Sequence, residues 1–543
     1  MSAEAVGERP TLFLRKATGL VRGWSVRDSM IYACLSTNVV TLGIFEFSYQ
    51  SFFPKGQLLT AILVSAVWVS FLVIAYAGLI VTIPRAGGDY VWQTRILGSG
   101  IGFVMAVTGW WFTLWLWAPI YGNVLSAEFF QPLLATLGHP SAATWFGKPT
   151  GIFVISIITI AMAGLLVSLG MAGYARIQKW GFYGGLVGFG VILLLLAVNN
   201  HATFVNSFNL EAQKIFGVHN AYQATNAGAA KIHYVSPTFG FSPIAASMLL
   251  VPMMMFYLLW PNWGSTLYGE IRGASDFRRV FSGMFGGLWI TVILSVLFLV
   301  LVNKTMGQAF YNNSGALYWS AYYGGKVSEA IPIWPYQVMF IGWMVHNQLF
   351  QVVLIVVMFL WFLAWVGTLF LSSTRVIFAA AFDRILPDRA AEVSEKRKVP
   401  VYSLVLMLLP AVILSAVYSY WSKFATYTLD ATLVIAVTYL FSAFAVVLLP
   451  FIKKELWNAS PASRIKLFGV QVVPAAGWIT IGLLAFNLWE WLTNDTYGVN
   501  NPDSLLYMLG TYILALLIYV VARIVRSRQG IDLGLINKEI PVE

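Results

Sequence analysis

Charged residues are scarce in this sequence, and cysteine is nearly absent. Asp, Glu, Lys and Arg make up 10% of the 543 residues, whereas soluble globular proteins carry about 25%. So few charges cannot cover the surface of a water-soluble globule of this length, which excludes a soluble enzyme. Intrinsic disorder is excluded too, because disordered chains combine low hydrophobicity with high net charge, and 59% of these residues are hydrophobic.

The single cysteine, Cys34, rules out an intrachain disulfide and a multi-cysteine metal site. The sequence also lacks a Gly-rich phosphate loop, a metal triad and a nucleophile elbow. We therefore expect neither an enzymatic activity nor a bound cofactor or metal. The formal net charge of +11 does not indicate nucleic acid as a partner, because the cations are scattered between apolar stretches instead of clustering on one face.

Long apolar stretches, by contrast, recur along nearly the whole chain. A helix needs about 20 apolar residues to cross the hydrocarbon core of a membrane, and the stretches predict an all-α polytopic membrane protein with twelve transmembrane helices. Their ranges are 28 to 51, 58 to 82, 100 to 130, 151 to 170, 178 to 199, 243 to 268, 281 to 303, 340 to 375, 401 to 421, 426 to 450, 470 to 493 and 505 to 525. The third and eighth ranges exceed one membrane thickness, so we expect these helices to tilt or to project beyond the bilayer.

The distribution of Lys and Arg predicts the orientation of these helices. With the N-terminus in the cytoplasm, 26 of the 33 cations fall on the cytoplasmic side and seven on the outside. A wrong number of spans would have inverted the later loops and removed this bias. The positive-inside rule therefore favours twelve spans, cytoplasmic N- and C-termini, and a place in the cell (cytoplasmic) membrane.

Two of the predicted spans contain residues that interrupt helices. Span one reads STNVVTLGIFEF, with Thr41 and Gly43, and span six reads FYLLWPNWGST, with Pro261 and Gly264. Transporters hold substrate at mid-membrane where helices in corresponding positions of two inverted repeats are unwound. Gly and Pro also occur in ordinary kinked membrane helices, but a matched pair five spans apart favours a binding site.

Two cytoplasmic motifs carry a resemblance to a known family. IPRAGGDYVWQTRILG follows span two, and STRVIFAAAFDRILPDRAAEVSEKRKVP follows span eight. Together with TLGIF in span one and GEIRGASDFRR after span six, they resemble the amino acid-polyamine-organocation (APC) superfamily of transporters, over roughly residues 20 to 450. The resemblance implies a ten-helix inverted-repeat core of the leucine-transporter type followed by two further helices.

This implied architecture divides the chain into six parts. They are a cytoplasmic N-terminal segment (1–27), a first five-helix repeat (28–199), an extracellular loop (200–242), a second five-helix repeat (243–450), helices 11 and 12 (451–525) and a cytoplasmic tail (526–543).

The resemblance also implies a substrate site at the two breaks, where unpaired amides and carbonyls supply fixed partial charges. The backbone amides of Leu42, Gly43 and Ile44 would bind the carboxylate of an amino acid. Its ammonium group would meet carbonyls near Val39 and from Tyr257 to Trp260. The side-chain pocket would be formed by Trp260, Asn262 and Trp263, with Trp110 or Trp111 nearby, which suits a neutral, apolar substrate. Thr41, where the family has Gly, and the Trp260-Pro261 pair both narrow this space.

The coupling ion is left open between Na⁺ and H⁺, and exchange without an ion is a third possibility. Acids inside membranes are expensive and are functional candidates; Glu46 lies one turn beyond the first break and is a candidate proton carrier. Ser372, Ser373 and Thr374 could bind Na⁺ beside the Val39 carbonyl, but such hydroxyls also bond to the preceding turn of their own helix.

The pattern as a whole predicts a secondary transporter that moves amino acids by alternating access. A polyamine or organic-cation transporter of the same fold is an alternative, although such a pocket would need more carboxylates than Glu46. A channel is the alternative from another class, but it would need a polar-lined pore through several helices. The expected partners are an amino acid substrate and the lipid bilayer, and the sequence does not predict an oligomeric state.

Overall fold

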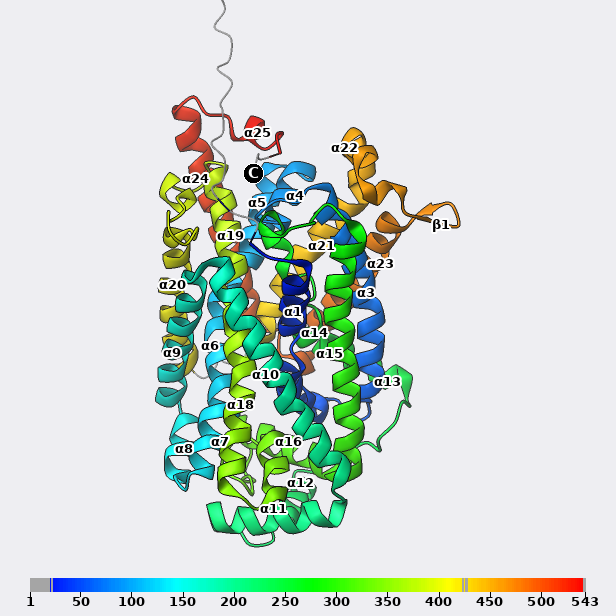
Figure 1. Cartoon of the computed structure of the whole chain (residues 1–543), viewed down its shortest axis with the longest axis vertical. Helices are drawn as coiled ribbons and strands as arrows, with labels where there is room; N and C mark the ends of the chain where they lie inside the picture. Colours follow the sequence, from blue (N-terminus) through cyan, green and yellow to red (C-terminus); the bar gives the residue numbers. More distant parts are fainter. Residues whose placement is uncertain (1–19, 21–22, 422–423, 425–427, 541–543) are drawn as a thin grey trace, which may run out of the picture.

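The computed structural model describes residues 20, 23–421, 424 and 428–540, and it is built almost entirely from helices (Figure 1). The helices of the predicted spans are α1 (Val26–Thr37), α2 (Ile44–Phe47), α3 (Leu58–Thr82), α5 (Ser99–Val107), α6 (Thr113–Leu125), α7 (Gln131–Thr136), α9 (Pro149–Ser168), α10 (Gly170–Val198), α14 (Val251–Leu258), α15 (Phe277–Thr305), α18 (Gln348–Val366), α19 (Thr368–Phe382), α20 (Val401–Tyr420), α21 (Thr428–Ile452), α23 (Val472–Thr493) and α24 (Pro502–Arg528).

Shorter elements lie in the connections and at irregular points within the spans. Their α-helices are α4 (Asp89–Ile96), α8 (Pro140–Phe146), α11 (His201–Phe216), α12 (Ala221–Lys231), α13 (Ile244–Met248), α16 (Gln308–Tyr322), α17 (Gln337–Gly342), α22 (Lys454–Ala459) and α25 (Leu533–Ile536). The π and 3₁₀ turns are η1 (Val39–Gly43), η2 (Ser48–Phe52), η3 (Thr108–Phe112), η4 (Ser126–Phe130), η5 (Trp263–Glu270), η6 (Trp343–Val345), η7 (Asp388–Ala391), η9 (Pro461–Arg464) and η10 (Asp495–Tyr497). Strands β1 (Lys466–Leu467) and β2 (Val470–Gln471) form one antiparallel hairpin.

Within the described residues, eleven helical stretches are long and apolar enough to cross a membrane. Each overlaps one predicted span, although Gly170–Val198 begins eight residues before its predicted range and Gln348–Phe382 begins eight residues after its own. Ser99–Thr136 and Gln348–Phe382, which correspond to the third and eighth predicted spans, are the longest, as their windows indicated. The predicted sixth span is absent from this set because its helix is divided between α14 and η5. The protein is therefore a polytopic, almost all-helical membrane protein, in which the predicted span 243–268 lacks a continuous helix.

The buried fraction of each stretch shows where it lies in the bundle. In the first stretch, 94% of the most apolar window is buried inside the protein, whereas the figure for the last stretch is 22%. The first stretch therefore lies at the centre, and α24 lies at the edge with most of its apolar surface facing outward. Around the centre, α1 packs on α15, α10 on α18, and α23 on both α21 and α3.

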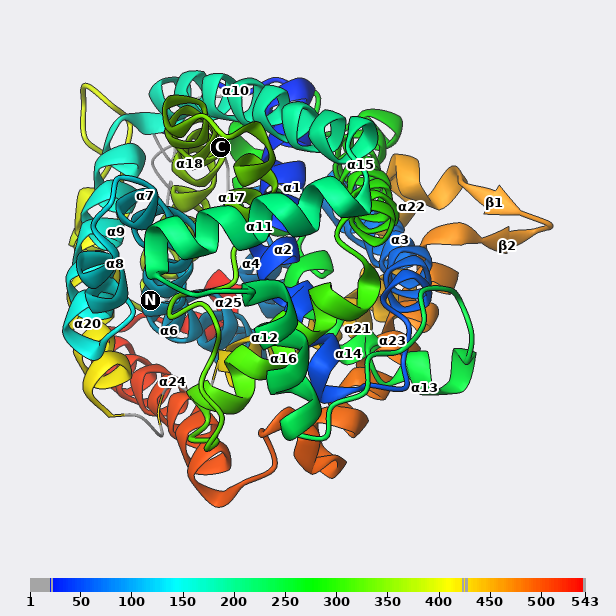
Figure 2. The same ribbon diagram turned by 90° about the horizontal axis from the view of Figure 1, so that it is seen from below.

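The two ends of the bundle differ in structure (Figures 1 and 2). The two long connections, 200–242 and 304–339, are not irregular loops, because they contain α11, α12 and α16, which cover one end. We call this the α11 end. The other end carries the C-terminus with α25, α4 and α22, and we call it the C-terminal end.

Candidate substrate site between the broken helices

The first span is broken at Asn38. Asn38 has a left-handed backbone (φ 31°) that ends α1, a conformation that Asn tolerates better than most residues because its side chain can bond locally. Its side-chain Oδ1 accepts hydrogen bonds from the Thr41 backbone N–H at 3.0 Å and from Trp361 Nε1 at 2.8 Å. The helix therefore ends just before the predicted residues Thr41 and Gly43, and both of them lie in the π turn η1 that follows Asn38.

The amides after this break are bonded within η1. The N–H of Gly43 donates to the Asn38 carbonyl at 2.9 Å, and the N–H of Ile44 contacts the carbonyls of Thr41 and Val39. This differs from the expectation that Gly43 and Ile44 present open amides, because the chain winds into a π turn instead of remaining extended.

The sixth span is broken between α14 and η5, at the predicted Trp260-Pro261 pair. The helix ends when Leu259 donates to Met255, and Pro261 has no N–H with which to continue it. The Trp260 side chain turns back to donate to the carbonyl of Phe256 at 2.6 Å, and its own carbonyl accepts from the N–H of Trp263 at 3.0 Å.

A shorter interruption, which the sequence analysis did not identify, lies in the eighth span at Gly367, the single residue between α18 and α19, where the backbone stays in the right-handed helical region. Tyr174 lies so close that a Cβ at this position would stand 2.3 Å from its Cε2 atom, which only glycine avoids. The Tyr174 hydroxyl donates to the carbonyl of Ala364 at 2.6 Å. Trp263 donates from its indole to the carbonyl of Thr368 at 3.0 Å, which joins the sixth and eighth spans at their breaks.

These breaks surround a small central cavity of about 10 Å³, enough for about one water molecule. It is lined by Ser36, Leu42, Trp117, Tyr121, Trp260, Trp263, Thr368 and Leu369, which come from spans one, three, six and eight. None of these side chains is charged. Three of the predicted residues, Leu42, Trp260 and Trp263, therefore reach the cavity directly.

The other predicted residues stand behind this lining. The Trp110 ring packs 4.6 Å from that of Trp263, and a Cβ at Gly43 would lie 3.4 Å from the Tyr257 ring. Asn262 is fully buried beside the break. Val39, Thr41 and Ile44 are likewise buried in η1 and at the start of α2.

Several residues of the cavity were not predicted, and part of this set had a signal in the sequence. Trp117 and Tyr121 follow Trp110 by seven and eleven residues, a spacing that places all three on one face of a helix. Asn38 was visible as an amide inside an apolar span. Thr368 and Leu369 had no such signal, because only packing against Trp263 brings them to the site.

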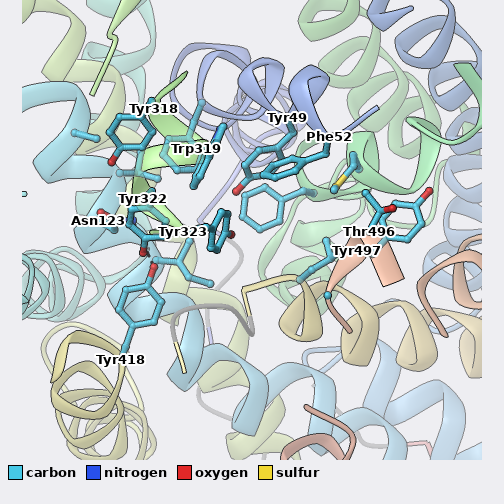
Figure 3. A pocket seen from close by; sticks show the side chains of 18 of the residues that line it. Tyr49, Phe52, Asn123, Tyr318, Trp319, Tyr322, Tyr323, Tyr418, Thr496 and Tyr497 are labelled. Atoms are coloured by element: carbon cyan, nitrogen blue, oxygen red, sulfur yellow. Dashed lines mark hydrogen bonds between the residues drawn. The ribbon is translucent and has the colours of Figure 1, made fainter. Parts of the chain in front are cut away.

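A larger cavity of about 380 Å³ lies toward the α11 end (Figure 3). Its lining includes six tyrosines and one tryptophan: Tyr49, Tyr318, Tyr322, Tyr323, Tyr418, Tyr497 and Trp319. We call it the outer cavity. Phe256, which lines it, stacks on Trp117 of the central cavity with ring centroids 5.0 Å apart. An aromatic layer therefore separates the two cavities.

Buried ion pairs close the opposite side, at the C-terminal end. Arg375 Nε and Glu270 Oε1 are 2.7 Å apart, and Arg95 Nη2 donates to Asp383 Oδ1 at 2.8 Å. All four side chains are buried. These pairs join the motif after span two, the segment after span six and the motif after span eight to one another, which gives their charged residues a shared structural role.

Asp89 of the GGDY segment is a second junction at this end. It accepts hydrogen bonds from Tyr76 of α3 at 2.5 Å, Ser442 of α21 at 2.6 Å and Ser265 of η5 at 3.1 Å. Burial raises the pKa of the Asp89 carboxyl above its ordinary value, although these hydroxyls oppose the shift.

Comparison with known proteins identifies the family of the chain. The profile of the family described as "Amino acid permease" matches residues 31–518. The chain is a member of this family. The permease is also 23% identical over 425 residues to the branched-chain amino acid permease BcaP of Lactococcus lactis subsp. cremoris (strain MG1363), an alignment that covers 77% of this chain and 79% of the relative. Members of this family are multi-pass membrane transporters and not enzymes, and they carry amino acids.

The ion-binding candidates of the permease occupy two different environments. Glu46 is fully buried, and neither carboxylate oxygen has a hydrogen-bond partner. The Ser372 hydroxyl donates to the Trp263 carbonyl at 2.8 Å and also contacts Tyr32. Ser373 and Thr374 donate to carbonyls three residues earlier in their own helix, at 3.0 Å and 2.8 Å. The hydroxyls are therefore already engaged, whereas the carboxylate of Glu46 is not.

Proposed function

We propose that the permease moves neutral, apolar amino acids across the cell membrane by alternating access around the central cavity. The observation that carries this proposal is the cavity itself, which lies where three interrupted spans meet and has an uncharged lining that is aromatic and aliphatic apart from Ser36 and Thr368. Apolar walls favour an apolar side chain through the burial of its surface. The similar protein from Lactococcus lactis is a branched-chain amino acid permease, which supports the same substrate class.

The polar ends of the substrate are bound by the backbone at the breaks. Because the amides of Gly43 and Ile44 are now bonded to carbonyls of η1, substrate binding unwinds this turn, and the substrate carboxylate takes the place of those carbonyls. The ammonium group meets carbonyls at Val39 and between Tyr257 and Trp260. The site must also widen, since about 10 Å³ does not admit an amino acid.

In this conformation, the path to the central cavity is less obstructed from the α11 end than from the C-terminal end. The outer cavity reaches the aromatic layer of Trp117 and Phe256, while the C-terminal end is held shut by the pairs Arg375–Glu270 and Arg95–Asp383. With cytoplasmic termini, the outer cavity faces the outside. In this proposal the divided span six also crosses the membrane, which brings the eleven helical crossings to twelve. Spans one to five and spans six to ten are inverted repeats.

Proton coupling through Glu46 is the second part of the proposal. Keeping an unpaired carboxylate ionised inside a protein costs roughly several kcal/mol, and no cation pairs with Glu46 among the described residues. Glu46 follows Phe45, which lines the outer cavity. We infer that it takes up a proton while the cavity faces outside and carries it through the closed state.

A thermal-shift panel on the purified permease tests the substrate class. Leucine, isoleucine, valine, phenylalanine, lysine, glutamate and putrescine are compared, each with and without Na⁺. The proposal predicts that the apolar amino acids raise the melting temperature and that putrescine, lysine and glutamate do not. Stabilisation by putrescine alone would instead favour the organic-cation alternative.

A further inference from the structure

The connection between α21 and α23 ends in a hairpin whose tip is apolar. In this hairpin Lys466 pairs with Gln471 and Leu467 with Val470, which leaves Phe468 and Gly469 as the two turn residues. Phe468 is 95% exposed, and Leu467 and Val470 are 61% and 60% exposed. None of these three side chains belongs to the buried core.

The backbone at the tip makes this aromatic residue more unusual. Phe468 and Gly469 have φ angles of 50° and 82°, the left-handed region that two-residue hairpin turns require and that Asn, Asp and Gly favour. A bulky residue there is a steric outlier. Neither packing nor turn geometry accounts for Phe468, so its place at the tip points to a contact outside the chain.

The hairpin lies where a membrane surface would meet it. Figures 1 and 2 show β1 and β2 projecting sideways from the bundle, near the C-terminal end. The strand β2 ends at Gln471, and the membrane-spanning helix α23 begins at Val472. The tip is therefore close to the level at which α23 enters the bilayer, and it extends beyond the neighbouring helices.

The charges around the tip are mostly of one sign. Lys454, Arg464 and Lys466 are exposed, and Glu455 is the acid of the segment 453–471. Within the part of the chain that the structure describes, these three cations form no ion pair with the protein. Exposed cations beside an apolar tip match the anionic headgroups and acyl boundary of a phospholipid leaflet.

The hairpin is also firmly attached to the bundle. The N–H of Val472 donates to the carbonyl of Ile465 at 3.1 Å, which closes its base. The hydroxyl of Ser460 contacts that of Thr82 at 2.7 Å, at the end of α3. A contact at the tip is therefore transmitted to α3 and α23, which pack on each other.

We propose that this hairpin is an interfacial anchor of the permease for anionic phospholipids. Phe468 inserts between the headgroups, and Lys454, Arg464 and Lys466 contact the phosphates. The inference does not depend on the amino acid that the permease carries.

Labelling at the tip tests the insertion. The chain has one cysteine, Cys34, which is fully buried, so a Phe468→Cys variant can carry an environment-sensitive fluorophore at this position. The permease is reconstituted with lipids that bear a quencher in the upper acyl chain, with Glu395→Cys, an exposed residue of another connection at the same end, as the control. We expect blue-shifted, quenched emission from position 468 and unquenched emission from position 395.

Two results would overturn the insertion. One is equal, water-like emission from both positions. The other is unquenched emission from position 468 together with oxidative cross-linking of two unlabelled Phe468→Cys copies through the introduced thiol, which would indicate a second copy of the chain as the occupant.

The dependence of quenching on lipid charge tests the second part of the proposal, the contact between the cations and the phosphates. Quenching at position 468 is measured in phosphatidylcholine and in an equal mixture with phosphatidylglycerol, in low and high salt. We expect stronger quenching with phosphatidylglycerol, weakened by salt, and loss of the difference when Lys454, Arg464 and Lys466 are all replaced by Gln. These exposed substitutions leave the core intact, and an unchanged melting temperature verifies this. Equal quenching in both lipids before the replacement would overturn the role of the anionic headgroup.

Discussion

The central cavity depends on a few side chains, of which Leu42 is the most direct probe. Its side chain lines the cavity from η1, so Leu42→Ala makes room for a larger substrate. We expect the ratio of kcat/KM for phenylalanine over leucine to rise about tenfold in transport assays, the effect of one or two methylene groups in an apolar pocket. Leu35→Ala is the matched control, since Leu35 is fully buried in the same span but does not line the cavity. An equal phenylalanine-to-leucine ratio in both variants would show that Leu42 does not contact the substrate.

Glu46 and Glu128 form a natural pair for testing proton coupling. Both are buried, and both lack hydrogen-bond partners, but only Glu46 lies on a broken span beside the site. We expect Glu46→Gln to flatten the pH dependence of uptake in proteoliposomes, because the amide cannot carry the proton, and Glu128→Gln to retain it. Unchanged pH dependence in Glu46→Gln would show that the proton is carried elsewhere or not at all.

The sequence predicted the site residues that stand at helix interruptions. It did not predict the residues that reach the central cavity only through packing between distant segments. Trp260 and Trp263 stand beside a proline inside an apolar span, so composition alone marks them. Thr368 is an ordinary residue in an apolar window, and its carbonyl matters only because Trp263 donates to it. The role of Asn38 was not predicted, because its side chain replaces backbone bonds at the end of α1 in a way that helix propensities do not describe.

Among the elements, the ion pair between α19 and η5 is the clearest determinant of the closed end. Arg375→Met leaves Glu270 buried without its partner, which costs roughly 3 to 5 kcal/mol. We expect a large loss of thermal stability in this single variant and partial recovery in the Arg375→Met, Glu270→Leu double variant. Arg279→Gln, which breaks an exposed pair with Asp276, serves as the control, with an effect below about 1 kcal/mol. A double variant as unstable as the sum of its singles would exclude a coupled pair.

The loop between α3 and α4 depends on close backbone contact with η5. Gly88 has a φ of 40°, and a Cβ there would lie 2.9 Å from the backbone of Ser265. Gly88→Ala is therefore expected to lower the melting temperature and to reduce uptake, since the loop can no longer close on η5. Gly190→Ala, on a helix with open space around it, is expected to leave the melting temperature unchanged or slightly higher. Similar melting temperatures for the two variants would contradict this role of the loop.

Element boundaries were largely predictable because apolar length is a strong signal in a membrane chain. Each of the eleven apolar helical stretches overlaps a predicted range, with displacements of up to eight residues. The break at Gly367 was not predicted, because a single glycine in an apolar window is common and only the contact with Tyr174 makes it necessary. The helices in the two long connections were not predicted, because they do not coincide with long apolar windows in the sequence.

For the whole molecule, the proposed alternating access rests on a difference between the two ends of the bundle. The outer cavity approaches the site through one aromatic layer, and buried ion pairs hold the other end. This asymmetry arises from contacts between residues far apart in the chain, such as Arg95 with Asp383, and the sequence motifs alone did not show that these residues pair. Alternating access requires these pairs to separate while the aromatic layer stays closed.

Counterflow in proteoliposomes is the measurement that tests this account most directly. Vesicles loaded with unlabelled leucine, lysine or putrescine are diluted into a trace of labelled leucine. The account predicts transient accumulation of label with internal leucine and none with lysine or putrescine, because a carrier exchanges only what its neutral cavity accepts. Equilibration of label without accumulation under every loading would indicate a channel and contradict the account, and so would exchange driven by putrescine but not by leucine.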